Sequence, residues 1–269
     1  MSLRINSNPE ALNAHRYLVQ TEGKLQKSME RLSSGYRINR AADDAAGLAI
    51  SEKLQAQING LDQAERNAQD AVSLVQTAEG SLDEVHEMLQ RVRELAVQYK
   101  NGTLSVSDQQ AIQSEVNQLA SEIERIGSTV QFNGVALLNS NSVISFQVGA
   151  NDGEIITVPT ISLGAAVTSL ALTLSPTGTS DIAEIDDAIQ AISAQRATFG
   201  AVQNRLEHTL NEISTYHENM SSAESRIKDV DMAAEMVNYT KLQILQQAGT
   251  SMLAQANQLP QSVLSLLRG

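Results

Sequence analysis

Apolar residues recur every seven positions through much of the first half of the chain. Between residues 44 and 100 one such series is accompanied by a second, three positions further on. The first comprises Leu54, Leu61, Ala68, Val75, Leu82, Leu89 and Ala96, and the second Ala64, Ala71, Ala78, Val85 and Val92. This alternating spacing places apolar side chains along one stripe of a helix. It predicts a single helix over 44–100, roughly 80 Å long at 1.5 Å per residue.

A second pair of series occupies the C-terminal third. Ile185, Ile192, Phe199, Leu206, Ile213, Met220, Ile227 and Ala234 recur every seven positions, and the companion series is Ala188, Val202, Tyr216, Ala223, Val230, Val237 and Ile244. Two long apolar stripes predict helices that bury each other. A shorter helix is expected over 107–127, with Ser107 and Gln110 as a capping box and Gly127 as its stop.

Only the middle of the chain has the alternating pattern of β-strands. Ile144, Phe146 and Val148 alternate with polar residues, "ANDGE" supplies a turn, and "EIITVPTIS" offers a second strand. We therefore expect a hairpin over 142–162 within a β-element of about 129–162, followed by a surface connection at 163–180. The predicted fold class is mainly α, a long antiparallel coiled-coil helical rod with a small β-hairpin element.

Both ends of the chain are amphipathic as well. Ala11, Leu18, Leu25 and Leu32 are spaced by seven near the start, and the tail contains Met252, Leu253, Leu259, Val263, Leu264, Leu266 and Leu267. Chain ends usually fray, and a large exposed apolar surface is typical of an interaction site. The sequence thus predicts that both ends are buried against other copies of the chain.

Composition narrows the function further. Aromatic residues make up 3% of the 269 residues, which suits long seams of small aliphatic side chains better than a globular core. The net charge is −12 without a basic cluster, so nucleic acid is not an expected partner. The absence of Cys excludes disulfides and thiolate chemistry. Neither a secretory signal nor a membrane span of about 20 apolar residues is evident, so composition alone indicates a soluble cytoplasmic protein.

Asp43 and Asp44, in "RAADDAAGLAIS", are the one pair of residues that suggests chemistry. Adjacent carboxylates on a helix point about 100° apart, which disfavours a shared metal or proton. Aspartate at a helix start accepts backbone N–H bonds, and we expect this role, with Arg31, Arg37 or Arg40, of the same chain or the next, as ion-pair partners. The four histidines have no ligand spacing. No catalytic group, cofactor or metal site is predicted.

Several segments together carry a resemblance to a known family. They are "NAHRYLVQTEGKLQKSMERLSSGYRINRAADDAAGLAIS", "LQRVRELAVQ", "QFNGVALLNS", "FQVGAND" and "AAEMVNYTKLQILQQAGTSMLAQANQLPQSVLSLLRG". In order and spacing the chain closely resembles bacterial flagellins. The resemblance implies a structural subunit that polymerises into the flagellar filament for motility. Residues 1–43 would pair with 228–269 to line the filament channel, and 44–227 would form the surrounding tube, without the outer domains of larger members.

The resemblance also implies residue roles and partners. Filament assembly is expected to involve Leu18, Leu25, Leu32, Asp43, Asp44, Ile244, Leu253, Val263, Leu264 and Leu267. Arg91, Leu95 and Glu115 match a surface that a host toll-like receptor contacts in many flagellins. Apart from the resemblance, Ser175 and Thr177 are candidates for glycosylation, because their hydroxyls should face outward. The implied partners are other flagellin subunits, the flagellar export apparatus with its chaperone, and the filament cap and hook-junction proteins. An extracellular filament, exported without a cleaved signal peptide, replaces the cytoplasmic assignment.

Three alternatives stay open at this stage. A hook–filament junction protein would share the terminal helices but would not polymerise alone. An enzyme on a helical scaffold lacks a nucleophile with its base and a phosphate loop in this sequence. A cytoplasmic receptor hairpin is disfavoured because no membrane span precedes it.

Overall fold

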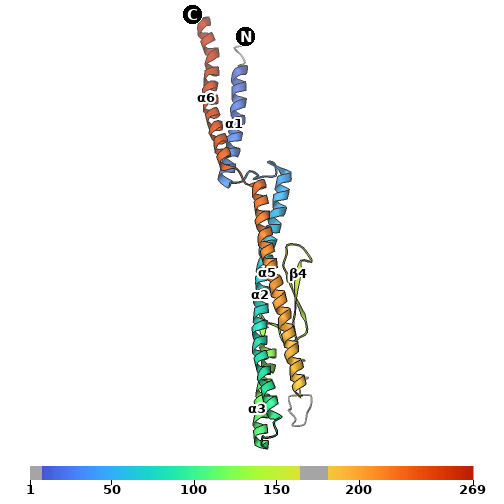
Figure 1. Ribbon diagram of the computed structural model, residues 1–269. Coiled ribbons are helices and arrows are strands. Elements are labelled where there is room, and N and C mark those ends of the chain that lie inside the picture. Colours follow the sequence, from blue (N-terminus) through green and yellow to red (C-terminus); the bar gives the residue numbers. More distant parts are fainter. Residues whose placement is uncertain (1–7, 164–180, 269) are drawn as a thin grey trace. The chain divides into compact units, whose positions relative to one another are not determined.

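A computed structural model describes residues 8–163 and 181–268, with side chains described as far as 258. The chain divides into two compact units, Met1–Ala56 with Asn219–Gly269 (unit 1) and Gln57–Glu218 (unit 2). The described part contains five helices and two short antiparallel strand pairs (Figure 1), so the mainly α-helical prediction is confirmed. The helices are α1 (Pro9–Ser34), α2 (Ala45–Tyr99), α3 (Val106–Thr129), α5 (Asp181–Lys228) and α6 (Met232–Arg268).

Unit 2 is built on the predicted seam of α2. Every member of the two α2 series from Leu61 to Ala96 is buried, and the facing positions of α5 are Ile185, Ala188, Ile192, Phe199, Val202, Leu206 and Ile213. The two helices run antiparallel, because Arg93 pairs with Asp186 at 2.6 Å and Asp83 pairs with Arg196 at 2.8 Å. The single long helix predicted over 44–100 is confirmed as Ala45–Tyr99.

The prediction of the α3 helix is confirmed, but its predicted caps are wrong. Ser105, two residues before Ser107, has the extended backbone of an N-cap and forms the capping box with Asp108. Ser107 already lies in the first turn. Gly127 does not end the helix but lies buried within its last turn, where a Cβ would be 3.2 Å from the Cβ of Leu163.

The β-hairpin is confirmed as β3 (Val143–Gln147) and β4 (Ile155–Pro159), with Val143 opposite Pro159 and Gln147 opposite Ile155. Pro159 O accepts a bond from Gln195 of α5, and Gln147 O accepts one from Asn67 of α2. A second, shorter pair, β1 (Gln131–Phe132) and β2 (Val135–Ala136), turns at Asn133 and Gly134, whose positive φ angles suit a tight hairpin.

The predicted surface connection at 163–180 needs one correction. Leu163 is buried at 1% exposure, and its N–H donates to Leu138 O at 2.9 Å. Residues 164–180, including Ser175 and Thr177, lie outside the described residues.

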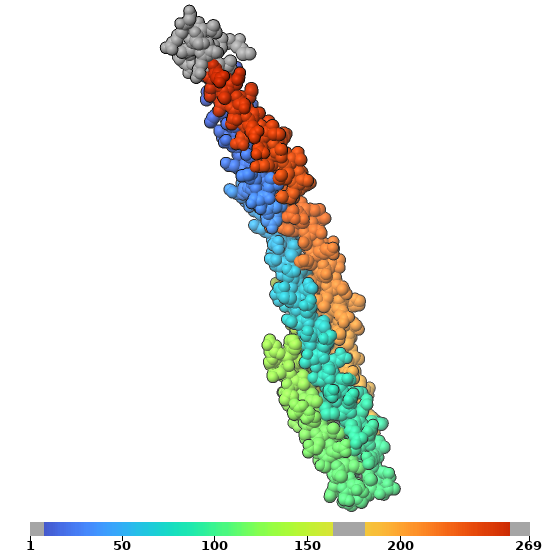
Figure 2. All heavy atoms as spheres, turned by 90° about the vertical axis from the view of Figure 1, so that its left-hand side faces the viewer, coloured from blue at the N-terminus to red at the C-terminus, as the bar shows by residue number. Residues whose placement is uncertain are grey.

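Unit 1 is dominated by the antiparallel pair of α1 and α6, drawn side by side in blue and red in Figure 2. The Asn8 side chain donates to Ala256 O at 2.7 Å, and Ser28 donates to Glu235 at 2.5 Å. The α1 seam consists of Ala11, Ala14, Leu18, Thr21, Leu25, Ser28 and Leu32, and the α6 seam of Glu235, Tyr239, Leu242, Gln246, Gly249, Leu253 and Ala256. Both seams alternate steps of three and four residues, as in a coiled coil.

The predicted phase of the α6 seam is wrong. The extension of the α5 series placed Ala234, Val237 and Ile244 in the interior, but all three are exposed. The reason is a break in the helix between Lys228 and Met232, where Asp231 accepts bonds from the first free N–H groups of α6. The heptad phase restarts at this break.

Candidate functional site in the terminal helix pair

Unit 1 buries little and exposes much apolar surface. Among its described residues the buried side chains are Ser28, Ile38, Ser51, Leu242 and Ala256. Its exposed large apolar side chains are Leu12, Tyr17, Val19, Met29, Tyr36, Ile50, Met232, Met236, Val237, Ile244, Leu245 and Met252. Where such side chains adjoin one another, as Met236, Val237 and Ile244 do on α6, an exposed apolar patch is typical of an interaction site.

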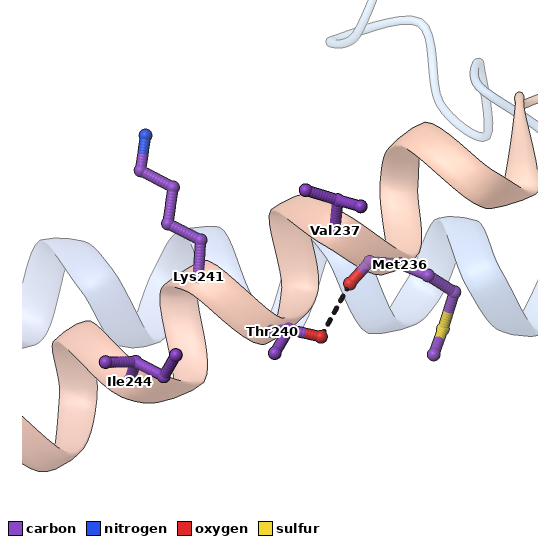
Figure 3. A pocket seen from close by; sticks show the side chains of 5 residues that line it. All are labelled: Met236, Val237, Thr240, Lys241 and Ile244. Carbon is purple, nitrogen blue, oxygen red and sulfur yellow. Dashed lines mark hydrogen bonds between the residues drawn. The ribbon is translucent and has the colours of Figure 1, made fainter.

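The face of α6 opposite its seam is the clearest part of this surface. Val237 and Ile244, seven residues apart, are 72% and 61% exposed. They line an open hollow of about 400 Å³ together with Met236, Thr240 and Lys241 (Figure 3). The Thr240 hydroxyl donates to Met236 O at 2.8 Å, so its hydrogen bond is satisfied within the helix. A helix that is apolar on two faces is typical of one buried on both sides. We call Met236, Val237, Thr240 and Ile244 the outer face of α6.

The predicted apolar assembly residues divide into three groups in the structure, and Asp43 and Asp44 form a fourth at the start of α2. Leu18, Leu25, Leu32 and Leu253 are half-buried in the seam and pack within the chain. Ile244 lies on the outer face of α6 and is exposed. The side chains of Val263, Leu264 and Leu267 lie outside the described residues.

Asp44 begins α2. Its Oδ1 accepts the N–H of Gly47 at 2.9 Å, and its backbone oxygen accepts the N–H of Leu48 at 3.0 Å. Such an N-cap satisfies donors that the first helical turn would leave unpaired. The carboxylate is therefore occupied with the backbone.

Asp43 lies in the loop before α2 and pairs with Lys27 of α1 at 2.5 Å. The bond from Lys27, aided by the backbone N–H groups of Asn39 and Arg40, lowers the pKa of Asp43 from 3.8 to about 2, although burial opposes the shift. Within the chain, the prediction of an arginine partner is wrong: Arg31 pairs with Glu235, Arg37 bonds to Ile227 O, and Arg40 pairs with Glu30. Lys27 is sixteen positions upstream, and only the reversal of the chain brings it close.

The ends of α1 and α5 are tied together beside these groups. Gly35 adopts a left-handed φ of 77° and ends α1, and its oxygen accepts the N–H of Val230 at 2.9 Å. Arg37 N–H donates to Lys228 O at 2.7 Å, and the Lys228 ammonium lies 4.7 Å from the centre of the Tyr36 ring. These contacts fix the path of the chain where α1 ends and α6 begins.

The predicted receptor-contact residues are only partly on one surface. Arg91 of α2 and Glu115 of α3 form an exposed ion pair at 3.0 Å, and Glu115, aided by Glu94, raises the pKa of Arg91. Leu95, however, is 2% exposed and belongs to the core of unit 2. The prediction that Leu95 contacts a receptor is therefore contradicted, because the α2 seam points its side chain inward.

Two observations bear on a metal site and on a membrane span. No group of three or more His, Asp and Glu residues in the described ranges 8–163 and 181–268 could hold a metal ion. Within the same part of the chain, no helix is long and apolar enough to cross a membrane.

Sequence reasoning missed the polar contacts of the seam, above all Ser28 with Glu235. Ser28 is 1% exposed, the most buried position of α1. Because a serine hydroxyl and a glutamate carboxylate are polar, these two residues do not contribute to an apolar repeat. The usable signal was the three–four spacing of Tyr239, Leu242, Leu253 and Ala256, once α6 is treated as a new helix.

Comparisons with known proteins agree with this architecture. The family model of the bacterial flagellin N-terminal helical region matches residues 5–142, and that of the C-terminal helical region matches residues 182–267. The flagellin of Halalkalibacterium halodurans is 54% identical over 98% of this chain and 99% of its own length. The flagellar filament 33 kDa core protein of Treponema phagedenis is 49% identical over 98% of this chain and 99% of its own.

A solved structure shows the same relationship. The crystal structure of Bacillus cereus flagellin has a TM-score of 0.52 and 34% identity, covering 59% of this chain and 94% of that one. Two family models, in order at the two ends, and relatives of high identity over nearly the whole length establish the assignment. The chain belongs to the bacterial flagellin family.

Proposed function

We propose that this chain polymerises into a bacterial flagellar filament through the outer face of α6. The filament role follows from relatives that are flagellins and filament core proteins over nearly their whole length. The observation that supports this route of assembly is the exposed apolar outer face of α6, which α1 of the same chain leaves uncovered. No finding favours the hook–filament junction alternative.

The physical basis of assembly is burial of that face. Complete burial of a side chain such as Val or Ile stabilises by about 1.5–3 kcal/mol. A contact between two different surfaces of identical subunits generates an open helix when its rotation does not close a ring. Several such side chains in each subunit could therefore drive growth of a filament.

The test is the assembly of subunits in which one outer-face side chain is polar. Ile244→Asn keeps the α1–α6 seam intact but would place an amide in the subunit contact, at a cost of about 1–3 kcal/mol for the amide plus the lost apolar burial. Gln243→Asn is the matched control, since position 243 is exposed on the same turn. We expect Ile244→Asn to raise the critical concentration for seeded polymerisation by about tenfold or more, and the control to leave it nearly unchanged.

Sedimentation and electron microscopy measure the assembled fraction, and circular dichroism confirms equal helicity of the monomers. Equal assembly by both variants would contradict a subunit contact at the outer face.

We assign the two ends of the chain to the filament channel. Residues 1–43 and 228–269 would line it, and residues 44–227 would form the tube around it. The pairing of α1 with α6 and the tie between Gly35 and Val230 support a boundary near these positions. The exposed small residues Ala41 and Ala42 beside this boundary would let neighbouring subunits approach closely.

The remaining partners rest on the family. We propose export through the flagellar apparatus with its chaperone, without a cleaved signal peptide, to an extracellular filament bounded by cap and hook-junction proteins. The flagellin family is structural, and we propose a structural rather than catalytic role for this member.

We also propose that a host toll-like receptor contacts the exposed pair of Arg91 and Glu115. Arg91→Ala should reduce receptor signalling, whereas Arg125→Ala, which removes another exposed ion-paired arginine, should not. Leu95→Ala is a poor test because it would open a core cavity and cost about 2–5 kcal/mol. A reporter-cell assay measures receptor signalling by the two variants. Wild-type signalling from Arg91→Ala would exclude the contact.

A further inference from the structure

Methionine is the only sulfur-containing residue of this chain, which has seven Met and no Cys. The exposed methionines among the described residues are all in unit 1, and they are Met29 (50%), Met232 (47%), Met236 (50%) and Met252 (66%). Met88 and Met220 are half-buried. Any oxidant that attacks thioethers would therefore meet the terminal helix pair first.

One of these thioethers, that of Met236, lies on the surface proposed for assembly, and those of Met232 and Met252 lie on the same helix. Met236 lines the hollow of the outer face with Val237 and Ile244, and Figure 3 shows its sulfur standing clear of the other labelled side chains. Met232 precedes it by one helical turn. Met252 lies further along the exposed side of α6, and Met29 lies beside the seam on α1.

We propose that these methionines are a site of reversible oxidation, by hydrogen peroxide or a similar two-electron oxidant, that prevents subunit assembly. The inference rests on the proposed function. A sulfur lone pair attacks one peroxide oxygen, the O–O bond breaks, and the departing hydroxide takes the proton of the new S–OH group to leave as water. The sulfur is oxidised to the sulfoxide by two electrons, and the peroxide is reduced.

The consequence for assembly follows from polarity. Methionine sulfoxide is a polar, chiral side chain that disrupts apolar interfaces, and two classes of reductase return it to methionine, one for each epimer. In the free subunit an exposed sulfoxide is solvated and leaves the fold intact. In a subunit contact it would be buried without a partner, which opposes association. Once copies cover the outer face, the thioethers should be protected.

The experiment compares four preparations in seeded polymerisation: untreated protein, peroxide-treated protein, treated protein repaired with both sulfoxide reductases, and a peroxide-treated variant. The variant carries Met29→Leu, Met232→Leu, Met236→Leu and Met252→Leu. Peptide mass mapping reports which methionines gain oxygen, and circular dichroism reports monomer helicity. A matched control variant carries Met88→Leu and Met220→Leu.

We expect oxidation of the four exposed methionines to raise the critical concentration by about tenfold or more, as expected for loss of one buried apolar side chain. Reductase repair and the four-leucine variant should both restore assembly, and the control variant should remain sensitive. Filaments treated after assembly should oxidise more slowly at these positions.

Unchanged assembly of the fully oxidised protein would overturn the inference, as would failure of reductase repair while helicity is retained. Equal sensitivity of the four-leucine variant would overturn it as well. Failure of the untreated protein to assemble would instead contradict the proposed function, so the two can be distinguished.

Discussion

Asp43 is held by one side chain and two backbone donors within unit 1. Lys27 is half-exposed, whereas the Asp43 side chain is only 13% exposed. The lowered pKa of Asp43, about 2 against 3.8, means that the folded state favours its ionised form. The residue pair once considered for acid–base chemistry therefore links the end of α1 to the start of α2.

Asp43→Asn should destabilise unit 1 in a pH-dependent way. Because the folded-state pKa of Asp43 is below its unfolded value, its contribution is fully present above about pH 4 and is lost as the pH falls through about 2. The loss at pH 7 should be about 1 kcal/mol or less, since Lys27 is solvated. Urea unfolding of parent and variant between pH 7 and 2 measures it, with Asp70→Asn, exposed on α2, as the control. A constant difference down to pH 2 would contradict this role.

At the scale of elements, the tip of the β3–β4 hairpin packs against a glycine of α2. A Cβ on Gly60 would lie 3.0 Å from the Cβ of Ala150 in the hairpin turn. Asn67, two turns along, donates to Gln147 O at 2.9 Å. The hairpin is thus anchored to α2 by a close approach and by a hydrogen bond.

Gly60→Ala and Gly80→Ala are a matched pair in the same helix. Each replacement should gain about 1 kcal/mol of helix propensity, but only Gly80 has open space around the new Cβ. We expect Gly80→Ala to stabilise the protein, and Gly60→Ala to fall short of that gain by about 1 kcal/mol because the hairpin must shift. Thermal unfolding gives the comparison. Equal increases in stability for the two variants would show that the hairpin tip does not pack closely against Gly60.

The same scale shows why some elements were predictable and others were not. The long α2 helix and its seam follow from the sequence because apolar residues fill the repeat from Leu61 to Ala96. The α6 seam contains Glu235, Gln246 and Gly249, which weaken the apolar signal. A Cβ added at Gly249 would lie 3.3 Å from Leu18 Cδ1. This close approach can be seen only once the two helices are paired. The pairing of Lys27 with Asp43 could not be predicted, because only the folded chain brings these two residues together.

At the scale of the whole molecule, the two units have unequal cores. The core of unit 2 joins α2, α3, α5 and the hairpin through many fully buried side chains. Among the described residues of unit 1, α1 buries only Ser28, and α6 buries Leu242 and Ala256. Local stability follows buried apolar contact. The terminal helices should therefore open far more readily than the core of unit 2 in a free subunit, and they are the part that assembly would stabilise.

Hydrogen exchange measured on free subunits and on filaments tests this coupling. In free subunits, amides of α1 and α6 should exchange with small opening free energies, while those of α2 near Leu82 and Leu89 should approach the global value. Filament formation should slow exchange in α1 and α6 most, because exposed side chains of these helices gain contacts that the single chain lacks. Amides in the core of unit 2 are already protected, so their exchange should change little. Full protection of α1 and α6 before assembly, or no gain on assembly, would show that folding of the terminal pair is independent of the filament.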